Sequence, residues 1–407
     1  MICRAHQLHI IAGLLNQMEI VNFVAWYIAL SILGIIAFPI LSKLFRRFPD
    51  KGYAFSRTAG LLLVTYLFWL MTSLGLAMNS VGGILSGVII LILSSLWIYR
   101  NESIQETYIW IKDHWKYAIS IEILFVLSFA SMTGVRAYNP DIFGTEKPME
   151  LMFINSILAS PTFPPHDAWL SQHAISYYYF GYVMVAMLAR ITGTPSSIAF
   201  NLGLSTLFAL TAVGGTGVCA NIISYTDSKI GDKAVSLFRS FFPSLLAPVF
   251  TLIIGNLYGV LEILHNNGMF WNTKVPAIYY DYGLDPAEAK PSAPPGGQAE
   301  PAIGAGLINL WDWLDLKRLN RQVFVDGTEF DWRSHNWFFA SRVIHDRNLV
   351  GVETEAIDEF PAFSFLLGDM HPHVLSPLRR ICGCTSVQLV AYWHGRHLLH
   401  PKCGLHR

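Results

Sequence analysis

The sequence predicts an all-α, polytopic transmembrane helical bundle of about seven spans, and three observations carry this prediction. Of the 407 residues, 53% are hydrophobic and only 14% are charged, whereas a soluble domain carries about 25% charged residues. The chain has 26 Phe, 17 Tyr and 12 Trp, too many aromatic side chains to stay solvated in a disordered chain. Lys and Arg together number 28, as do Asp and Glu. No basic field therefore exists to hold nucleic acid.

Seven apolar stretches reach or approach the length of about 20 residues that a helix needs to cross a bilayer. They are Ile20–Leu41, Thr58–Met78, Val81–Tyr99, Tyr117–Thr133, Tyr178–Ile191, Ile198–Ile223 and Phe241–Leu264. We interpret residues 18–264 as the transmembrane domain of a multi-pass protein of the cell membrane, surrounded by the lipid bilayer. Residues 1–17 lack a small-residue cleavage site and contain Arg4, so they do not resemble a signal peptide. We expect them to be a spurious N-terminal extension, with Met18 as the start.

The charges of the loops predict how the spans are oriented. The loop between the first two spans is basic, with Lys43, Arg46, Arg47, Lys51 and Arg57 against Asp50, so we expect it to be cytoplasmic. Counting onward places the long loop 136–176 outside, which its acidic excess favours. The same count places the loop from Lys229 to Arg239 outside, although its basic residues favour the cytoplasmic side. It places the residues after Leu264 inside. The prolines near residue 245 also allow a re-entrant pair of helices. The sidedness of residues 265–407 therefore stays open.

Residues 265–358 differ in composition from the spans before them. A Pro/Gly/Ala-rich linker occupies residues 287–301, where neither a helix nor a strand persists. An aromatic stretch of mixed charge follows, with Trp311, Trp313, Trp332 and Trp337. Its composition favours an amphipathic segment at the membrane interface, where Trp is stable; a wall of a substrate site is the alternative.

The external loop holds a first group of candidate functional residues. Pro148 fits only the first turn of a helix, which predicts a short helix over residues 148–158. Glu150 then lies in that first turn and Glu146 at its start, so both carboxylates reach one small volume. There they act as a catalytic base or hold a divalent cation. The alternative for Glu150 is a helix-start acid that stabilises the positive end of the helix dipole.

Two further features of this loop are open to two interpretations. Asp167 follows Pro164-Pro165 where the chain enters the membrane. It is interpreted either as a third functional acid or as the N-cap of the next helix. Tyr177, Tyr178 and Tyr179 lie where a membrane-interface belt is expected, and composition favours the belt over a binding role.

A second group lies in the block 359–378, which contains the run EFPAFSFLLGDMHPHVL. Glu359 and Asp369 bracket an apolar stretch, and Pro372 favours an extended conformation at His371. Residues two apart in an extended chain share a face, so His371 and His373 point the same way. Together with Asp369 they form a candidate site for a metal or a phosphate.

Four sequence runs resemble one known family. YYYFGY (177–182), TEKPME (145–150), PPHDAW (164–169) and EFPAFSFLLGDMHPH (359–373) resemble the archaeal and chloroflexal "YYY" membrane proteins, an uncharacterised family. The resemblance covers residues 18–378. The family is similar to GT-C type glycosyltransferases, which take a sugar from a polyprenyl-phosphate carrier and use acids in an external loop. The resemblance implies a GT-C-like external loop in which Glu146, Glu150 and Asp167 are the catalytic acids. It also implies that Asp369, His371 and His373 face the same cavity.

The chain departs from the family in three places. Glu150 stands where the family has Asp, Ala168 stands where Pro is usual, and the membrane helices expected after His373 are missing. Residues 379–407 have five cations and no acids, and we interpret them as an aberrant tail from a truncated or frameshifted reading frame. The alternative is a zinc site, although the spacing matches no common module. Its ligands would be Cys382, Cys384, His394, His397, His400 and Cys403.

Three functions fit these observations. The first is a membrane glycosyltransferase with a polyprenyl-phosphate-linked sugar donor. The second is a transporter or flippase, for which the acidic residues within the predicted spans are Glu122 and Glu262. The third is a non-catalytic membrane protein whose sequence runs only pack helices.

Overall fold

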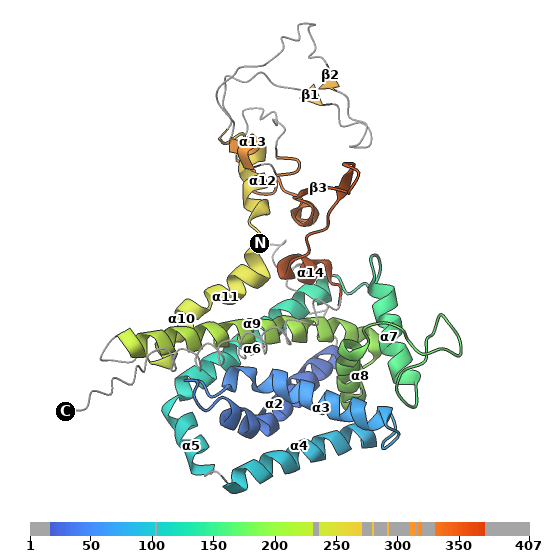
Figure 1. Ribbon diagram of the computed structural model, residues 1–407, viewed down its shortest axis with the longest axis vertical. Helices are drawn as coiled ribbons and strands as arrows, with labels where there is room; N and C mark the ends of the chain where they lie inside the picture. The colour runs from blue at the N-terminus through green and yellow to red at the C-terminus, as the bar shows by residue number, and fades with distance from the viewer. Residues whose placement is uncertain are drawn as a thin grey trace, which may run out of the picture. The chain divides into compact units, whose positions relative to one another are not determined.

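The computed structural model describes residues 17–101, 104–230, 236–270, 279–280, 291–292, 310–314, 316–319 and 330–370. The chain forms two compact units, one combining residues 1–253 with 364–407 and the other formed by residues 254–363. Helices predominate among the described residues (Figure 1). His371, His373, the tail 379–407 and nearly all of the extension 1–17 and of the linker 287–301 lie outside the described residues.

The first unit is a bundle of helices. They are α2 (Gln17–Leu44), α3 (Ser56–Ser73), α4 (Val81–Asn101), α5 (Ile104–Asp113), α6 (Trp115–Tyr138), α7 (Lys147–Ala159), α8 (Phe180–Thr192), α9 (Ser196–Ile230), α10 (Leu237–Ser244) and α11 (Leu246–Pro248), with a 3-10 turn η1 (Tyr53–Phe55) and a π-helical turn η2 (Val249–Ile254). In the described part, six helical stretches are long and apolar enough to cross a membrane: Glu19–Leu44, Tyr53–Ser73, Val81–Ile98, Trp115–Tyr138, Ser196–Tyr225 and Leu237–Ile254. This confirms the predicted all-α bundle with several spans.

The predicted span Tyr178–Ile191 is the short helix α8 instead. It has only 13 residues, about 20 Å at 1.5 Å per residue, which is too short for a bilayer core of about 30 Å. Its start lies beside the end of α3, because Trp69 Nε1 donates to the Tyr179 hydroxyl at 3.0 Å. Its end lies beside the start of α2, because the Thr194 hydroxyl donates to Asn22 Oδ1 at 3.0 Å. Both ends of α8 therefore lie at one end of the bundle, which we call the acidic end.

The opposite end, which we call the basic end, is formed by the loop between α2 and α3. The buried carboxylate of Asp50 orders this loop by accepting the backbone N–H of Gly52 at 2.8 Å. Burial raises the pKa of Asp50 above its usual value. Gly52 has φ +77°, and a Cβ there would lie 2.8 Å from the Phe45 ring, so the turn requires glycine.

The basic end also holds the last turns of α9 and the start of α10. The backbone N–H of Asp50 donates to Asn221 Oδ1 at 3.1 Å, and the ring of Phe241 lies 6.4 Å from that of Tyr117 at the start of α6. The prediction that the Lys229–Arg239 loop lies opposite the first basic loop is therefore wrong. The count of spans failed because it included α8, whereas the charge rule indicated the observed arrangement.

Small residues let α2 and α3 approach closely. A Cβ on Gly60 would lie 2.2 Å from the Leu33 carbonyl oxygen, and one on Gly34 would lie 3.1 Å from the Arg57 backbone nitrogen. Close backbone approach of this kind replaces the hydrophobic driving force that water supplies in soluble bundles. The two helices consequently cross at these glycines.

The second unit contains short elements. They are α12 (Tyr258–Asn266), β1 (Tyr279–Tyr280), β2 (Pro291–Ser292), α13 (Leu310–Leu314), η3 (Trp337–Ser341), β3 (His345–Arg347) and β4 (Glu353–Glu355), while α14 (Pro361–Leu367) leads back into the first unit. Strands β3 and β4 pair antiparallel, with Asp346 opposite Thr354. Trp311 is buried, and its Nε1 donates to the Met269 carbonyl at 3.0 Å. It thus packs in the core of this unit, whereas Trp313 and Trp332 are exposed.

Candidate functional site

Helix α7 positions the first two candidate acids. The predicted helix 148–158 is confirmed as Lys147–Ala159, with a Pro in the first turn and Glu146 as its N-cap residue. Glu150 donates its backbone N–H to the Glu146 carbonyl at 3.0 Å. The two carboxylates are close enough to interact electrostatically, as the spacing predicted. Glu146 is exposed and Glu150 is fully buried.

The far end of α7 is held by the neighbouring helices. Asn79, between α3 and α4, donates its side-chain amide to the Ser160 carbonyl at 2.7 Å. Arg190 of α8 donates to the Leu158 carbonyl at 2.7 Å. These bonds satisfy carbonyls that a helix end leaves without an internal partner, and they fix α7 at the acidic end.

Glu150 contacts a segment 220 residues away in the sequence. Its Oε2 accepts the backbone N–H of Met370 at 2.8 Å, and its Oε1 accepts the Tyr182 hydroxyl at 3.4 Å. Burial raises the pKa of Glu150 to about 8, and the nearby charges of Asp369 and Glu146 act in the same direction. At neutral pH the carboxyl group is therefore mostly protonated.

Asp369 directly precedes Met370 in this segment and is also buried. Its Oδ1 accepts the Thr145 hydroxyl at 2.6 Å, which joins it to the turn that precedes α7. Gly368, at the end of α14, has φ +80°, and a Cβ there would lie 2.7 Å from Arg136 Nη1. The backbone conformation therefore favours glycine, and the Arg136 guanidinium packs against it.

Two cations border these acids. Arg136, in the last turn of α6, donates through Nε to Asn201 Oδ1 at 2.8 Å and interacts electrostatically with Asp369. The Lys147 side chain approaches Gly368 as well, since a Cβ there would lie 3.7 Å from Lys147 Cε. We call Glu146, Glu150 and Asp369, with these two cations, the acid cluster. It joins α6, α7 and the chain after α14.

The three tyrosines have three different surroundings. Tyr177 stacks on Phe153 of α7 with ring centroids 5.2 Å apart, and burial together with the charges of Glu146 and Glu150 raises its pKa. Tyr178 is 74% exposed. Tyr179 is the N-cap residue of α8 and accepts a hydrogen bond from Trp69. Of these three tyrosines, Tyr177 is thus the one that interacts with the acid cluster.

Asp167 and Glu359 are the remaining candidate residues that the structure describes. The Asp167 carboxylate accepts the backbone N–H groups of Trp169 at 2.8 Å and Leu170 at 3.0 Å. It therefore orders its own loop and is not the N-cap of α8. Glu359 is an exposed residue of the second unit, while His371 and His373 fall outside the described residues. Within the described ranges, no group of three or more His, Cys, Asp or Glu side chains is suited to hold a metal ion.

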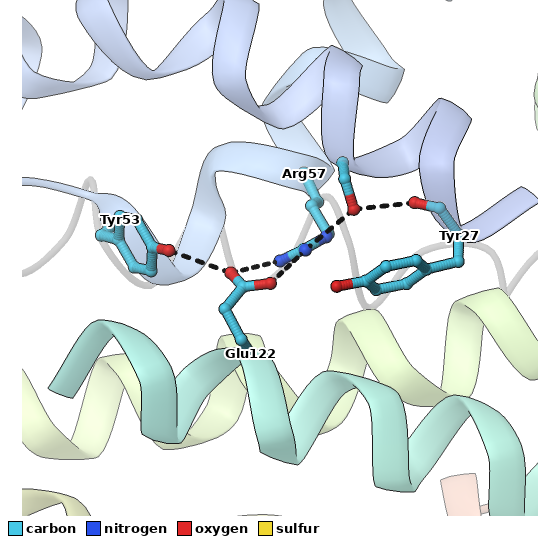
Figure 2. Close-up of polar contacts among 5 residues, drawn as sticks. Tyr27, Tyr53, Arg57 and Glu122 are labelled. Carbon is cyan, nitrogen blue, oxygen red and sulfur yellow. Dashed lines mark hydrogen bonds and ion pairs between the residues drawn. The ribbon is translucent and has the colours of Figure 1, made fainter. Parts of the chain in front are cut away.

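A second polar cluster lies inside the bundle (Figure 2). Arg57 Nη1 donates to Glu122 Oε1 at 2.9 Å, and the same oxygen accepts the Tyr53 hydroxyl at 3.0 Å. Arg57 Nη2 donates to the Ser31 hydroxyl at 3.0 Å, and the guanidinium carbon lies 4.4 Å from the centre of the Phe125 ring. Arg57 is thus no loop cation: it lies in α3 and forms an ion pair with Glu122 of α6.

Sequence reasoning missed several contributors to the acid cluster. The prediction placed Arg136 in the external loop 136–176, and Thr145 and Tyr182 received no role of their own. The signal that was available for Arg136 is its position in the last turn of an apolar helix, beside the acidic loop.

Six candidate spans in the described part and the ion pair between Arg57 and Glu122 within the bundle define a polytopic membrane protein. The chain belongs to the family described as uncharacterized membrane protein (DUF2298), whose model matches residues 63–395. The matched region includes every residue of the acid cluster. No curated protein and no solved structure matches the chain.

Proposed function

We propose that the protein is a glycosyltransferase of the cell membrane that takes a sugar from a polyprenyl-phosphate carrier. The observation that carries this proposal is the meeting of Glu150 with Met370, 220 residues later. It joins two acidic segments and two cations in one cluster at the acidic end of a membrane bundle. By the positive-inside rule that end faces outward, where a sugar on a flipped lipid carrier is accessible.

Glu146 is the proposed general base, because it is the exposed carboxylate of the cluster. The acceptor hydroxyl gives its proton to Glu146 while its oxygen bonds to the anomeric carbon of the sugar. The bond from that carbon to the phosphate oxygen breaks, and polyprenyl phosphate leaves with the electron pair. Lys147, partly exposed beside Glu146, stabilises the negative charge of the departing phosphate.

Glu150 and Asp369 are proposed as positioning residues. Both are buried, and both have carboxylate oxygens occupied by hydrogen bonds to groups of the protein. A mostly protonated Glu150 holds the segment after α14 against α7 and is a poor base at pH 7. Tyr177, stacked on Phe153, offers an aromatic surface on which a sugar ring packs.

The resemblance to "YYY" proteins and GT-C enzymes is the second support. Its sequence runs include the residues of the acid cluster apart from Arg136, as well as Tyr177. On this resemblance, Glu359, His371, His373, Tyr178 and Tyr179 are proposed to bind substrate and Asp167 to belong to the acidic set.

The test is sugar transfer by the full chain reconstituted in liposomes with radiolabelled polyprenyl-phosphate hexoses. Glu146→Gln is expected to lower kcat about 100-fold or more, within the range for a lost general base. Glu106→Gln is the matched control, because Glu106 is also an exposed acid at the start of a helix, α5. Absence of transfer by the wild-type chain from every donor, or equal rates for the two variants, refutes the proposal.

Transport is the alternative that the Arg57–Glu122 pair favours, since charges inside a bundle often mark a path. Each of these charges has a partner of opposite sign, together with hydroxyl groups, which fits a structural lock better than a carrier site. Lipid or sugar flux in the same liposomes, abolished by Glu122→Gln and without sugar transfer, would establish the alternative.

A further inference from the structure

A cavity of about 530 Å³ lies at the basic end, between the start of α6 and the start of α10. This volume falls within the range of about 300–1,000 Å³ of small-molecule sites. It is lined by Asp113, His114, Trp115, Lys116, Tyr117, Ser236, Leu237, Phe238 and Arg239. The acid cluster is formed by other residues, so the proposed transfer reaction makes no use of this cavity.

The lining favours an anion. Lys116 and Arg239 are cationic, against the single carboxylate of Asp113. The first backbone N–H groups of a helix lack partners within the helix and point away from its start, which favours negative charge there. Both α6, with 24 residues, and α10, with 8 residues, begin at this cavity. The two helix starts therefore add to the charge of the two cations, while the end of α5 at Asp113 opposes them.

The Lys116 ammonium group lies near aromatic rings of both α6 and α10. Its Nζ lies 5.7 Å from the centre of the Trp115 ring and 6.0 Å from that of the Phe238 ring, so one aromatic contact comes from each helix. Trp115 is 52% exposed. Exposed Trp beside cations at the start of a span is typical of the headgroup level of a bilayer.

The back wall of the cavity is fixed. His114 stacks on Trp110 with ring centroids 5.0 Å apart, and its Nδ1 lies 3.0 Å from the Trp110 carbonyl oxygen. Because a carbonyl only accepts, this nitrogen carries the hydrogen. The Trp110 Nε1 in turn donates to the Pro49 carbonyl at 3.0 Å, which ties the wall to the loop between α2 and α3. The cavity is therefore built into the basic end rather than formed by a loose surface loop.

We propose that this cavity binds the phosphate headgroup of an anionic membrane lipid. The phosphate contacts Lys116 and Arg239, and the acyl chains lie against the apolar faces of the spans that begin beside them. The basic end faces the cytoplasm by the positive-inside rule, where anionic lipids attract basic residues near the membrane. The binding site is a lipid site on the membrane face opposite the acid cluster.

The test is native mass spectrometry of the full chain in detergent, titrated with phosphatidylglycerol or phosphatidylcholine. The wild type is expected to retain one phosphatidylglycerol in preference to phosphatidylcholine. The Lys116→Gln/Arg239→Gln variant should bind phosphatidylglycerol at least about tenfold more weakly, since two charge-assisted hydrogen bonds are lost. Lys112→Gln is the matched control, because Lys112 is an exposed cation of α5 that does not line the cavity.

Two outcomes overturn the proposal: equal loss of phosphatidylglycerol in Lys112→Gln, and unchanged binding in the double variant. Displacement of the lipid by inorganic phosphate alone would assign the cavity to a soluble phosphate and overturn the lipid assignment. A photoactivatable phosphatidylglycerol on the wild-type chain keeps the test independent of variant folding. It should label residues 113–117 and 236–239, and labelling elsewhere only would count against the site.

Discussion

The replacement Glu150→Gln tests whether Glu150 is protonated in the folded protein. The pKa of Glu150 is raised from 4.5 to about 8. Below pH 4.5 the folded and unfolded states are both protonated, and the group has no effect on stability. As the pH rises toward 8, only the unfolded state ionises, so the folded state loses stability. One pKa unit corresponds to about 1.4 kcal/mol, which gives a loss of about 3 kcal/mol between pH 5 and pH 8.

Glutamine removes this loss but keeps an acceptor for the Met370 N–H. The variant should therefore match the wild type near pH 5 and be more stable near pH 8 by about 3 kcal/mol. The assay is thermal unfolding of both proteins in detergent from pH 5 to pH 9, with hydrogen exchange at residues 364–370 as a local readout. A stability difference that does not change with pH would refute the reasoning, because it would mean an ordinary pKa for Glu150.

Three further predictions concern the bundle itself. Breaking the ion pair by Arg57→Met should lower the free energy of unfolding by about 2–4 kcal/mol, and the melting temperature with it. The double variant Arg57→Met/Glu122→Met should recover at least half of the lost melting temperature. A double variant as unstable as the single one would contradict this. Gly60→Ala should destabilise the protein by about 2 kcal/mol or more because its Cβ meets the Leu33 carbonyl. Gly134→Ala is the control, because nothing lies within 4 Å of the new atom, and it should stabilise the protein by up to about 1 kcal/mol. Similar melting temperatures for the Gly60→Ala and Gly134→Ala variants would show that the close crossing of α2 and α3 is wrong. Cysteines at Arg46 and Ser236 should react with an impermeant reagent from the same membrane side, and a cysteine at Asp141 from the opposite side; any other pattern would contradict the six-span arrangement.

The spans could largely be predicted from sequence because hydropathy and length are local properties. Five of the seven predicted stretches nearly coincide with observed spans, and a sixth, Phe241–Leu264, overlaps Leu237–Ile254. The predicted span Tyr178–Ile191 failed on length alone, and this one error reversed the predicted side of the Lys229–Arg239 loop. The basic charge of that loop was the better guide, because charge placement does not depend on counting the spans before it.

The local half of the acid cluster could also be predicted. Pro148 set the start of α7, and helix geometry then placed Glu146 and Glu150 within reach of each other. The contact between Glu150 and Met370 could not be derived from spacing, since it closes a separation of 220 residues. Arg57 and Arg136 were both interpreted as loop cations because an arginine at the edge of an apolar run looks the same whether it faces water or a buried carboxylate.

The most direct test of the central claim is a disulfide crosslink between the two halves of the acid cluster. Thr145 Oγ1 and Asp369 Oδ1 lie 2.6 Å apart, so cysteines at these two positions should crosslink rapidly under mild oxidation of the membrane-embedded chain, whereas a Glu106→Cys/Asp369→Cys pair should not. Efficient crosslinking of the first pair alone is the predicted result. Its absence, or equal crosslinking of both pairs, would mean that the two acidic segments do not share a site.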